Sequence, residues 1–314
     1  MTTEVLLKEV DSALSELGIY TNPIETSDAI KIANSVTNSY ILAKTLMEQD
    51  KDQQSILVRI NGQIWPPFTR EGEDKNLSSL KKIGIETNVI YNDINYRFQV
   101  CKFPDASKRF DQFNTDEQYK MIPAISREIK KYHELESFKG HYPITATMNN
   151  AFSRLNDEEK EFVKKIHYVM MDLATILEND HDNLVFSHND LFSSSIYVEK
   201  SVEPTRITLV DWEYSGKNHR AFDLAFLSFK THFTPLHDRK LIQEYDRANV
   251  FNTEYSFHMT KPLIPYLYLL WSKLKKEDLL ENVCGFMSNT YIMHSVRQLK
   301  FEDNITSKMI SNCL

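Results

Sequence analysis

Residues 184–216 read LVFSHNDLFSSSIYVEKSVEPTRITLVDWEYSG. Apolar runs at 184–186 and 207–210 are each followed by a polar loop, and a third run at 196–198 continues in an extended pattern between them. Short apolar runs bounded by polar or turn residues are typical of buried strands. We expect such strands to direct the side chains of the two loops into one cleft, namely His188, Asp190, Asp211 and Glu213.

Three of these four side chains are carboxylates, and no Lys or Arg stands among them. Carboxylates that converge repel one another unless a cation lies between them. Magnesium carrying a nucleotide is the natural candidate, because Mg²⁺ takes oxygen ligands from one or two carboxylates and from phosphates. A His-x-Asp triplet also occurs by chance, and a buried Asp often caps a turn. His188 and Asp190 therefore need the wider pattern to indicate catalysis.

The wider pattern is the order of strand, HND loop, strand and DWE loop, with Asp211 placed 21 positions after Asp190. This order resembles the small-molecule kinases that share the catalytic-loop and metal-binding logic of protein kinases, and in particular the choline/ethanolamine kinase family. In that family the first loop reads much like HND-L-x-x-x-N-I and the second like I-D-(W/Y/F)-E-Y-(A/S)-G. The corresponding residues of the second loop here are 210–225, VDWEYSGKNHRAFDLA.

The resemblance, which spans roughly residues 30–295, implies an α+β, bilobal protein-kinase-like fold. A small N-terminal antiparallel β-sheet lobe (1–103) would bind nucleotide, and a larger, mainly helical lobe (104–314) would carry catalysis and substrate binding. Periodicity agrees with that division. It predicts hairpins at 27–61 and 88–103 and helices at 1–18, 69–85, 116–136, 157–179, 239–251, 260–275 and 277–301.

Composition limits the partners of the chain. A net charge of −7 over 314 residues disfavours a nucleic-acid surface and tolerates a cationic small substrate. The three cysteines have no metal-binding spacing, and the N-terminus has no signal-peptide core. The longest apolar run, at 262–271, is too short to span a bilayer. We therefore expect a cytoplasmic protein without a membrane or nucleic-acid partner.

ATP and Mg²⁺ are the cofactors that the family resemblance implies. Arg59 stands where the family grips the nucleotide phosphates, and Glu73 stands where a helix supplies the carboxylate that pairs with that residue. The first hairpin would cover the phosphates. No glycine lies in the chain between Gly18 and Gly62, so phosphate contacts there would come from side chains, which are those of Ser35, Thr37 and Asn38.

The resemblance also assigns roles in the two loops. Asp190 would orient the substrate hydroxyl or accept its proton, and His188 would brace the loop. Asp211 would hold the Mg²⁺, with Glu213 as a second metal or substrate contact. Ser195 stands where the family has an asparagine metal ligand. Catalysis would consist mainly of positioning and charge neutralisation, because phosphoryl transfer has a loose transition state.

The segments PYLYLLWSKL (265–274) and CGFM (284–287) resemble family segments that line the acceptor site, and the resemblance implies an aromatic wall there. Such a wall suits an ammonium substrate, because a ring face attracts an ammonium ion. Tyr268, Trp271 and Phe286 are its candidate members, although core packing accounts equally well for aromatics at helical spacing. Asp223 is expected to brace the catalytic loop through backbone amides. Lys230 stands where we expect a carboxylate that would face a substrate ammonium.

The leading hypothesis is an ATP-dependent kinase that phosphorylates the hydroxyl of an amino alcohol, choline or ethanolamine first, in phospholipid biosynthesis. The glycine-free hairpin, Ser195 and Lys230 favour a different hypothesis, a kinase-like binding protein with weak or no phosphotransfer. A third hypothesis keeps the kinase and changes the acceptor to an aminoglycoside or a sugar. The sequence leaves a homodimer open.

Overall fold

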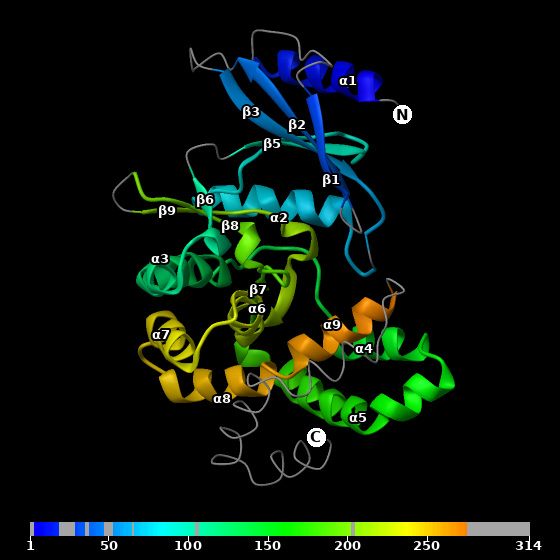
Figure 1. Ribbon diagram of the computed structural model, residues 1–314, viewed down its shortest axis with the longest axis vertical. Coiled ribbons are helices and arrows are strands. Elements are labelled where there is room, and N and C mark those ends of the chain that lie inside the picture. Colours follow the sequence, from blue (N-terminus) through cyan, green and yellow to red (C-terminus); the bar gives the residue numbers. More distant parts are fainter. Residues whose placement is uncertain are drawn as a thin grey trace. The chain divides into compact units, whose positions relative to one another are not determined.

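The computed structural model describes residues 3–18, 29–34, 38–46, 53–64, 66–103, 107–201 and 205–274 (Figure 1). The chain divides into two compact units. The sheet unit comprises Met1–Phe113 and Ser194–Glu213, and the helical unit comprises Asn114–Ser193 and Tyr214–Leu314. No helix of the described part is both long enough and apolar enough to cross a membrane.

The sheet unit is built on a five-stranded antiparallel sheet with the order β1-β2-β3-β5-β4. The longest pairing joins β2 to β3, which form the expected hairpin. The first arm of that hairpin was expected to begin at residue 27, but it consists of two antiparallel strands, β1 and β2. β4 and β5 form the second expected hairpin. The bounds of the five strands are Ala29–Asn34, Asn38–Leu46, Gln53–Asn61, Val89–Asn92 and Phe98–Lys102 for β1 to β5.

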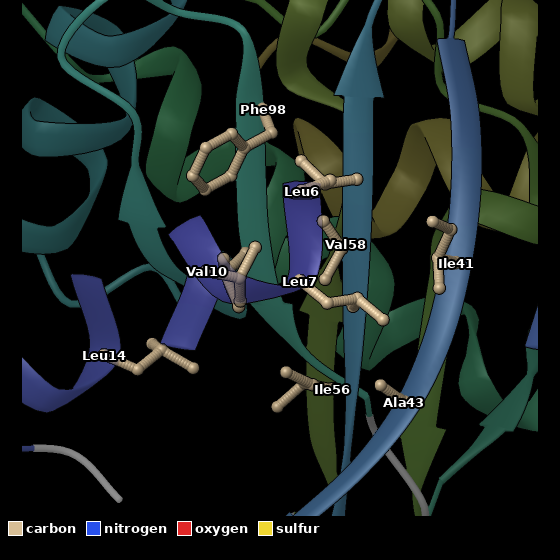
Figure 2. Packing of buried hydrophobic residues seen from close by; sticks show 10 residues of the cluster. Leu6, Leu7, Val10, Leu14, Ile41, Ala43, Ile56, Val58 and Phe98 are labelled. Carbon is tan, nitrogen blue, oxygen red and sulfur yellow. The ribbon is translucent and has the colours of Figure 1, made fainter. Parts of the chain in front are cut away.

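Helix α1 (Thr3–Glu16) covers one face of this sheet. Its buried side chains recur every three or four positions, which is the period of a helix with one apolar face. They pack against alternate side chains of the central strands, as Figure 2 shows. The cluster consists of Leu6, Leu7, Val10 and Leu14 from the helix and Ile41, Ala43, Ile56, Val58, Phe98 and Val100 from the sheet.

Helix α2 (Arg70–Lys82) carries site residues in its first turn. Thr69 is its N-cap, because the Thr69 hydroxyl accepts a hydrogen bond from the backbone N–H of Gly72 at 3.0 Å. The helix ends before Gly84, whose φ of 72° lies in the left-handed region that glycine tolerates. Both ends agree with the sequence prediction.

The segment 194–213 joins the sheet unit through a second, three-stranded sheet with the order β6-β8-β9. β6 (Lys108–Arg109) pairs with β8 (Ile196–Glu199), which pairs with β9 (Arg206–Leu209). This pairing explains why the division differs from the boundary expected after residue 103. The first unit extends to Phe113 and also takes in the segment that leads to Asp211.

The helical unit contains one two-stranded sheet, in which β7 (Leu184–Ser187) pairs with β10 (Gly216–His219). α3 packs against α7, α6 packs against α8, and α4, α5 and α9 contact one another. The helices of this unit are α3 (Thr115–His133), α4 (Ile144–Ser153), α5 (Asp157–Asn179), α6 (Ala221–Thr231), α7 (Pro235–Tyr245), α8 (Val250–Thr260) and α9 (Leu263–Leu274).

The helix expected at 239–251 is in fact two elements, because α7 ends at Tyr245 and α8 begins at Val250. The Asp246 carboxylate accepts hydrogen bonds from the backbone N–H of Asn249 and from the Thr253 hydroxyl. Such local bonds compete with the helix and end it. The helix expected at 277–301 lies outside the described residues.

The predicted fold class is confirmed: an antiparallel-sheet unit and a mainly helical unit form an α+β, protein-kinase-like chain. β7 and β9, which precede the two polar loops, belong to different sheets and different units. The convergence of Asp190 and Asp211 on one cation therefore stays a prediction.

Candidate active site

The first polar loop begins where β7 ends, at residues 188–190. The backbone N–H groups of His188 and Asn189 donate to the two carboxylate oxygens of Asp223, at 2.7 and 2.8 Å. Asn189 has a φ of 67°, a left-handed conformation that a non-glycine residue adopts only when its surroundings hold it there. Asp223 therefore fixes the shape of the loop, as the sequence predicts.

Asp223 is fully buried, and its carboxylate is satisfied by several donors. The Tyr132 hydroxyl donates to it at 2.8 Å, and His133 Nε2 lies 3.2 Å from the same oxygen. Burial alone would raise the pKa of Asp223, but the bonds from His133 and from the loop amides hold it below its ordinary value. The loop is thus held by an anion that stays charged in the protein interior.

The catalytic-loop candidates differ in their surroundings. The His188 side chain is fully buried, and its Nδ1 accepts the backbone N–H of Asp190 at 3.3 Å, which supports the bracing role expected for it. Asp190 is only partly buried. Burial and the charge of Asp190 together raise the pKa of Tyr142 well above its usual range. Asp190 is thus the more accessible of the two predicted catalytic residues.

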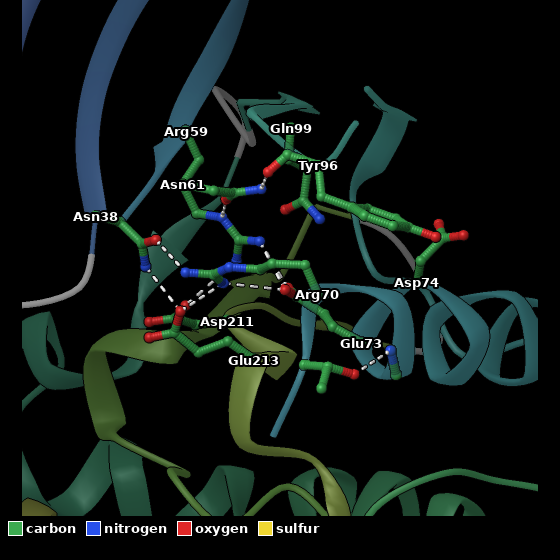
Figure 3. A network of polar contacts seen from close by, with 12 residues as sticks. Asn38, Arg59, Asn61, Arg70, Glu73, Asp74, Tyr96, Gln99, Asp211 and Glu213 are labelled. Atoms are coloured by element: carbon green, nitrogen blue, oxygen red, sulfur yellow. Dashed lines mark hydrogen bonds and ion pairs between the residues drawn. The ribbon is translucent and has the colours of Figure 1, made fainter. Parts of the chain in front are cut away.

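In the sheet unit, a network of charged side chains joins β2, β3, α2 and the DWE loop (Figure 3). The predicted ion pair is present: Arg59 Nη2 lies 2.8 Å from the Glu73 carboxylate, and both side chains are buried. A second arginine, Arg70, contacts Glu73 at 3.1 Å and Glu213 at 2.7 Å, and donates to Asn38 Oδ1 at 2.7 Å. The Asn38 amide also donates to Glu213 at 2.8 Å.

Asp211 differs from the other carboxylates of this network. Its Oδ1 is shielded from water and accepts no hydrogen bond from any described residue, and the nearest arginine, Arg59, is 3.8 Å away. Burial and the neighbouring Glu213 raise the pKa of Asp211 to about 7, whereas Arg59 and Arg70 hold the pKa of Glu213 low against the effect of burial. Asp211 also has a left-handed backbone, with a φ of 70°.

A cavity of about 410 Å³ opens beside this network and is lined only by residues of the sheet unit. Its polar lining includes Arg59, Glu73, Arg109, Ser195 and Asp211, and Cys101 of β5 and the adjoining Phe103 also line it. Apolar side chains of β3, α2 and the DWE loop complete the wall. Its volume lies in the range of small-molecule and cofactor sites.

The donor set fits a hard cation that keeps water or phosphate as most of its ligands, as Mg²⁺ does. The observation that supports this fit is Asp211 Oδ1, which accepts no hydrogen bond from a described residue and belongs to a side chain that lines the same cavity as Ser195. Glu213 is engaged by Arg70 and Asn38. Within the described ranges, no three or more His, Cys, Asp or Glu side chains are grouped so that they could hold a metal ion by themselves.

The remaining predicted residues are distributed as follows. Ser35, Thr37 and Phe286 lie outside the described residues, and Trp271 belongs to α9 but its side chain is outside them. Tyr268 is in α9 of the helical unit. The structure brings Asn38, Arg59, Glu73, Asp211, Ser195 and Glu213 together in the sheet unit, whereas His188 and Asp190 belong to the helical unit.

The sequence reading overlooked Arg70, which binds three members of the network. A signal for it was present. Arg70 is the first residue of α2, and a cation at a helix N-terminus opposes the helix dipole. An arginine at that position, followed by acidic residues, is better explained by partners outside its own helix.

The fold, the loop shaped by a buried aspartate in the helical unit and the cavity lined by Arg59 and Asp211 in the sheet unit are features expected of a small-molecule phosphotransferase. The choline/ethanolamine kinase family model matches residues 30–296, and the chain belongs to that family. It is accordingly a phosphotransferase that uses an alcohol group as acceptor.

Relatives of the chain are distant in sequence. Protein LicA of Haemophilus influenzae is 21% identical over 222 residues, which cover 67% of this chain and 81% of that protein. The structure of choline kinase LicA from Streptococcus pneumoniae superposes with a TM-score of 0.67 at 16% identity, covering 98% of this chain and 99% of the other. A choline/ethanolamine kinase family protein from Mesorhizobium loti gives 0.65 at 19% identity, with 98% of both chains covered.

Proposed function

We propose that this protein transfers the γ-phosphoryl group of Mg·ATP to the hydroxyl of a small amino alcohol, choline or ethanolamine first. The observation that carries the proposal is the Asp211 carboxylate, whose Oδ1 accepts no hydrogen bond from a described residue, in the lining of a cavity that Arg59 also lines. A phosphate-bound cation would offset the burial of this carboxylate and its repulsion from Glu213, the two effects that raise the pKa of Asp211.

Nucleotide binding is assigned to the sheet unit. The cavity offers apolar walls for a base and a guanidinium for phosphate, because Arg59 is held in place by Glu73. A LicA structure that superposes on this chain with a TM-score of 0.66 contains AMP, which supports the assignment. Asp211 and Ser195 would hold Mg²⁺, which neutralises the charge that develops on the phosphates.

Asp190 is assigned to the acceptor hydroxyl, which it orients and from which it takes the proton as the new P–O bond forms. The amides of His188 and Asn189, which are bonded to Asp223, keep the loop that carries Asp190 in place. This division leaves Asp190 accessible to substrate, while the buried charge that shapes the loop is a separate residue. Positioning of this kind supplies much of the catalysis in phosphoryl transfer.

The choice of amino alcohols rests on the family and on the named activities of relatives, a choline kinase in one case and a probable choline kinase in another. Cytoplasmic location and a role in phospholipid synthesis follow from the same reasoning and remain predictions. Aromatic rings near the catalytic loop, Phe192 and Tyr268, provide an ammonium-binding surface in the helical unit.

A coupled ADP-release assay tests the proposal with choline, ethanolamine, an aminoglycoside and a sugar, each with and without Mg²⁺. We expect ADP release above the acceptor-free rate only with an amino alcohol and Mg²⁺ together. A thermal shift with Mg·ATP but no turnover with any acceptor would favour the kinase-like binding protein, and turnover with only an aminoglycoside or sugar would change the acceptor.

A further inference from the structure

Lys230, near the end of α6, directs its ammonium group at three aromatic rings. Its Nζ lies 3.3 Å from the ring centroid of Tyr268, 4.6 Å from that of Phe192 and 5.5 Å from that of Phe229. All three distances are within the range of cation–π attraction. The residues expected to form a substrate wall thus include one, Tyr268, that already carries an ammonium ion of the protein itself.

The rings belong to two aromatic pairs of the helical unit, and the Lys230 ammonium contacts both pairs. Phe192 packs edge-on against Phe226 at 5.3 Å, and Phe229 packs against Tyr268 at 6.2 Å. Phe192 lies two positions after Asp190, and its backbone N–H donates to the carbonyl of Asp190 at 2.9 Å. The ammonium site is therefore built from the catalytic loop, α6 and α9.

We propose that Lys230 is a tethered competitor of the acceptor: its ammonium occupies the aromatic site that receives the ammonium of the amino alcohol. This inference rests on the proposed function and specifies which residue sets the affinity for the acceptor. The site binds ammonium ions, as the position of Lys230 shows, and a substrate cation must displace that side chain to use the same rings.

Two cations do not share one ring face, because like charges a few ångströms apart repel strongly in a partly dry site. Lys230 is only partly buried, so its long side chain has a route to solvent. The apparent affinity for the acceptor is then the intrinsic affinity reduced by the fraction of molecules in which Lys230 has left the rings. Removal of the lysine removes this reduction.

The test is the Lys230→Ala variant of the full chain, with choline as the probe. We expect the Kd for choline, measured by calorimetry, and the KM for choline to fall about tenfold, which corresponds to about 1.4 kcal/mol. The KM for ATP should not change. Lys230→Arg keeps a cation on the rings and should give no such gain. Lys200→Ala is the matched control, since Lys200 lies 4.3 Å from the Phe113 ring in the sheet unit.

An unchanged or weaker choline Kd in Lys230→Ala, with an unchanged melting temperature, would overturn the proposal. The same variant separates it from the proposed function, because binding and turnover are measured independently. Tighter choline binding without ADP release would refute phosphotransfer to choline and leave the competitor in place. Turnover of choline by the wild type and by Lys230→Ala at equal KM and equal Kd would support the proposed function and refute the competitor role of Lys230.

Discussion

The two loops that carry the acidic residues are stabilised in opposite ways. In the helical unit, the loop at 188–190 is shaped by backbone amides bonded to a single buried carboxylate, Asp223. In the sheet unit, the DWE loop is held by side-chain ion pairs, in which Arg70 contacts Glu213 and Glu73. One loop depends on one buried anion and the other on a balance of opposite charges.

The difference suits the two tasks proposed for the units. A catalytic loop has to keep one geometry, and backbone hydrogen bonds fix a chain more tightly than long side chains do. A nucleotide site has to change its charge balance when phosphates and a cation arrive. A network in which one oxygen of Asp211 accepts no hydrogen bond from a described residue is suited to that change. The predictions below test this contrast in order of expected effect.

Asp190→Ala gives the largest expected effect, because it removes the proposed proton acceptor. We expect kcat to fall about 10²- to 10⁴-fold, the contribution typical of a general base. The KM for ATP and the urea midpoint should change little if nucleotide binding belongs to the sheet unit. ADP release and equilibrium unfolding measure the two effects.

The matched control is Asp182→Ala, which removes an exposed carboxylate from the same unit. It should retain the wild-type kcat. Near-normal turnover in Asp190→Ala would remove this loop from the chemistry and leave it as a structural element only.

Arg70→Met is expected to have the next largest effect. It leaves Glu213 and Glu73 buried without a shared cation, and breaking a buried ion pair by removal of one partner costs about 3–5 kcal/mol. The free energy of unfolding from urea titration is the measurement. The control is Lys75→Met, because Lys75 pairs with Glu71 on the same helix and both side chains are more than half exposed, at 53% and 59%. Exposed pairs contribute at most about 1 kcal/mol, so equal losses would contradict a stabilising network.

The same contrast explains which features of the fold and the site could be predicted from the sequence. The catalytic loop and Asp223 belong to motifs of adjacent residues, and a local motif fixes local geometry. The hairpin at 88–103 and the helix that Thr69 caps were predictable for the same reason. The network of the sheet unit brings together residues from β2, β3, α2 and the DWE loop, and only the fold determines which of them meet. Arg59 and Glu73 came from the family resemblance, and Arg70 had no motif to mark it.

Strand β10 and helix α4 were also missed. β10 reads GKNH, which has no apolar alternation, and it forms because its backbone pairs with β7. α4 follows Pro143 without a side-chain N-cap and is stabilised by contacts with α5 and α9. Tertiary contacts override weak local preference in both.

Acid should weaken the helical unit through His219. Burial lowers the pKa of His219 to about 4, although the neighbouring Asp180 acts in the opposite direction. The His219 Nδ1 accepts the Ala221 N–H at 3.1 Å, and only the neutral ring can accept that bond. The folded pKa is below the unfolded value of about 6.5, so the contribution is complete above pH 6.5 and is lost as the pH falls toward 4.

We expect the free energy of unfolding to fall by about 2 to 3 kcal/mol more in wild type than in His219→Gln between pH 7 and pH 4.5. His181→Gln, at an exposed histidine, should keep the wild-type slope. Parallel curves for wild type and His219→Gln would show that the neutral ring does not contribute to acid sensitivity.

The smallest effect is expected where the DWE loop leads into β10, at Gly216. A Cβ there would lie 2.9 Å from the carbonyl carbon of Gly140, a backbone atom that cannot rotate away. Gly140 and Tyr142 are themselves hydrogen-bonded to the backbone of Lys217, so the added methyl would separate that segment from β10. Overpacking of this kind costs about 1 to 2 kcal/mol.

Gly216→Ala should lower the urea midpoint accordingly, and Lys217→Ala, at an exposed position of the same strand, should not. Because the Gly216 carbonyl lies 3.4 Å from the Asn189 amide, Gly216→Ala should also lower kcat, whereas a loss of stability with unchanged kcat would show that the loop keeps its geometry independently of β10.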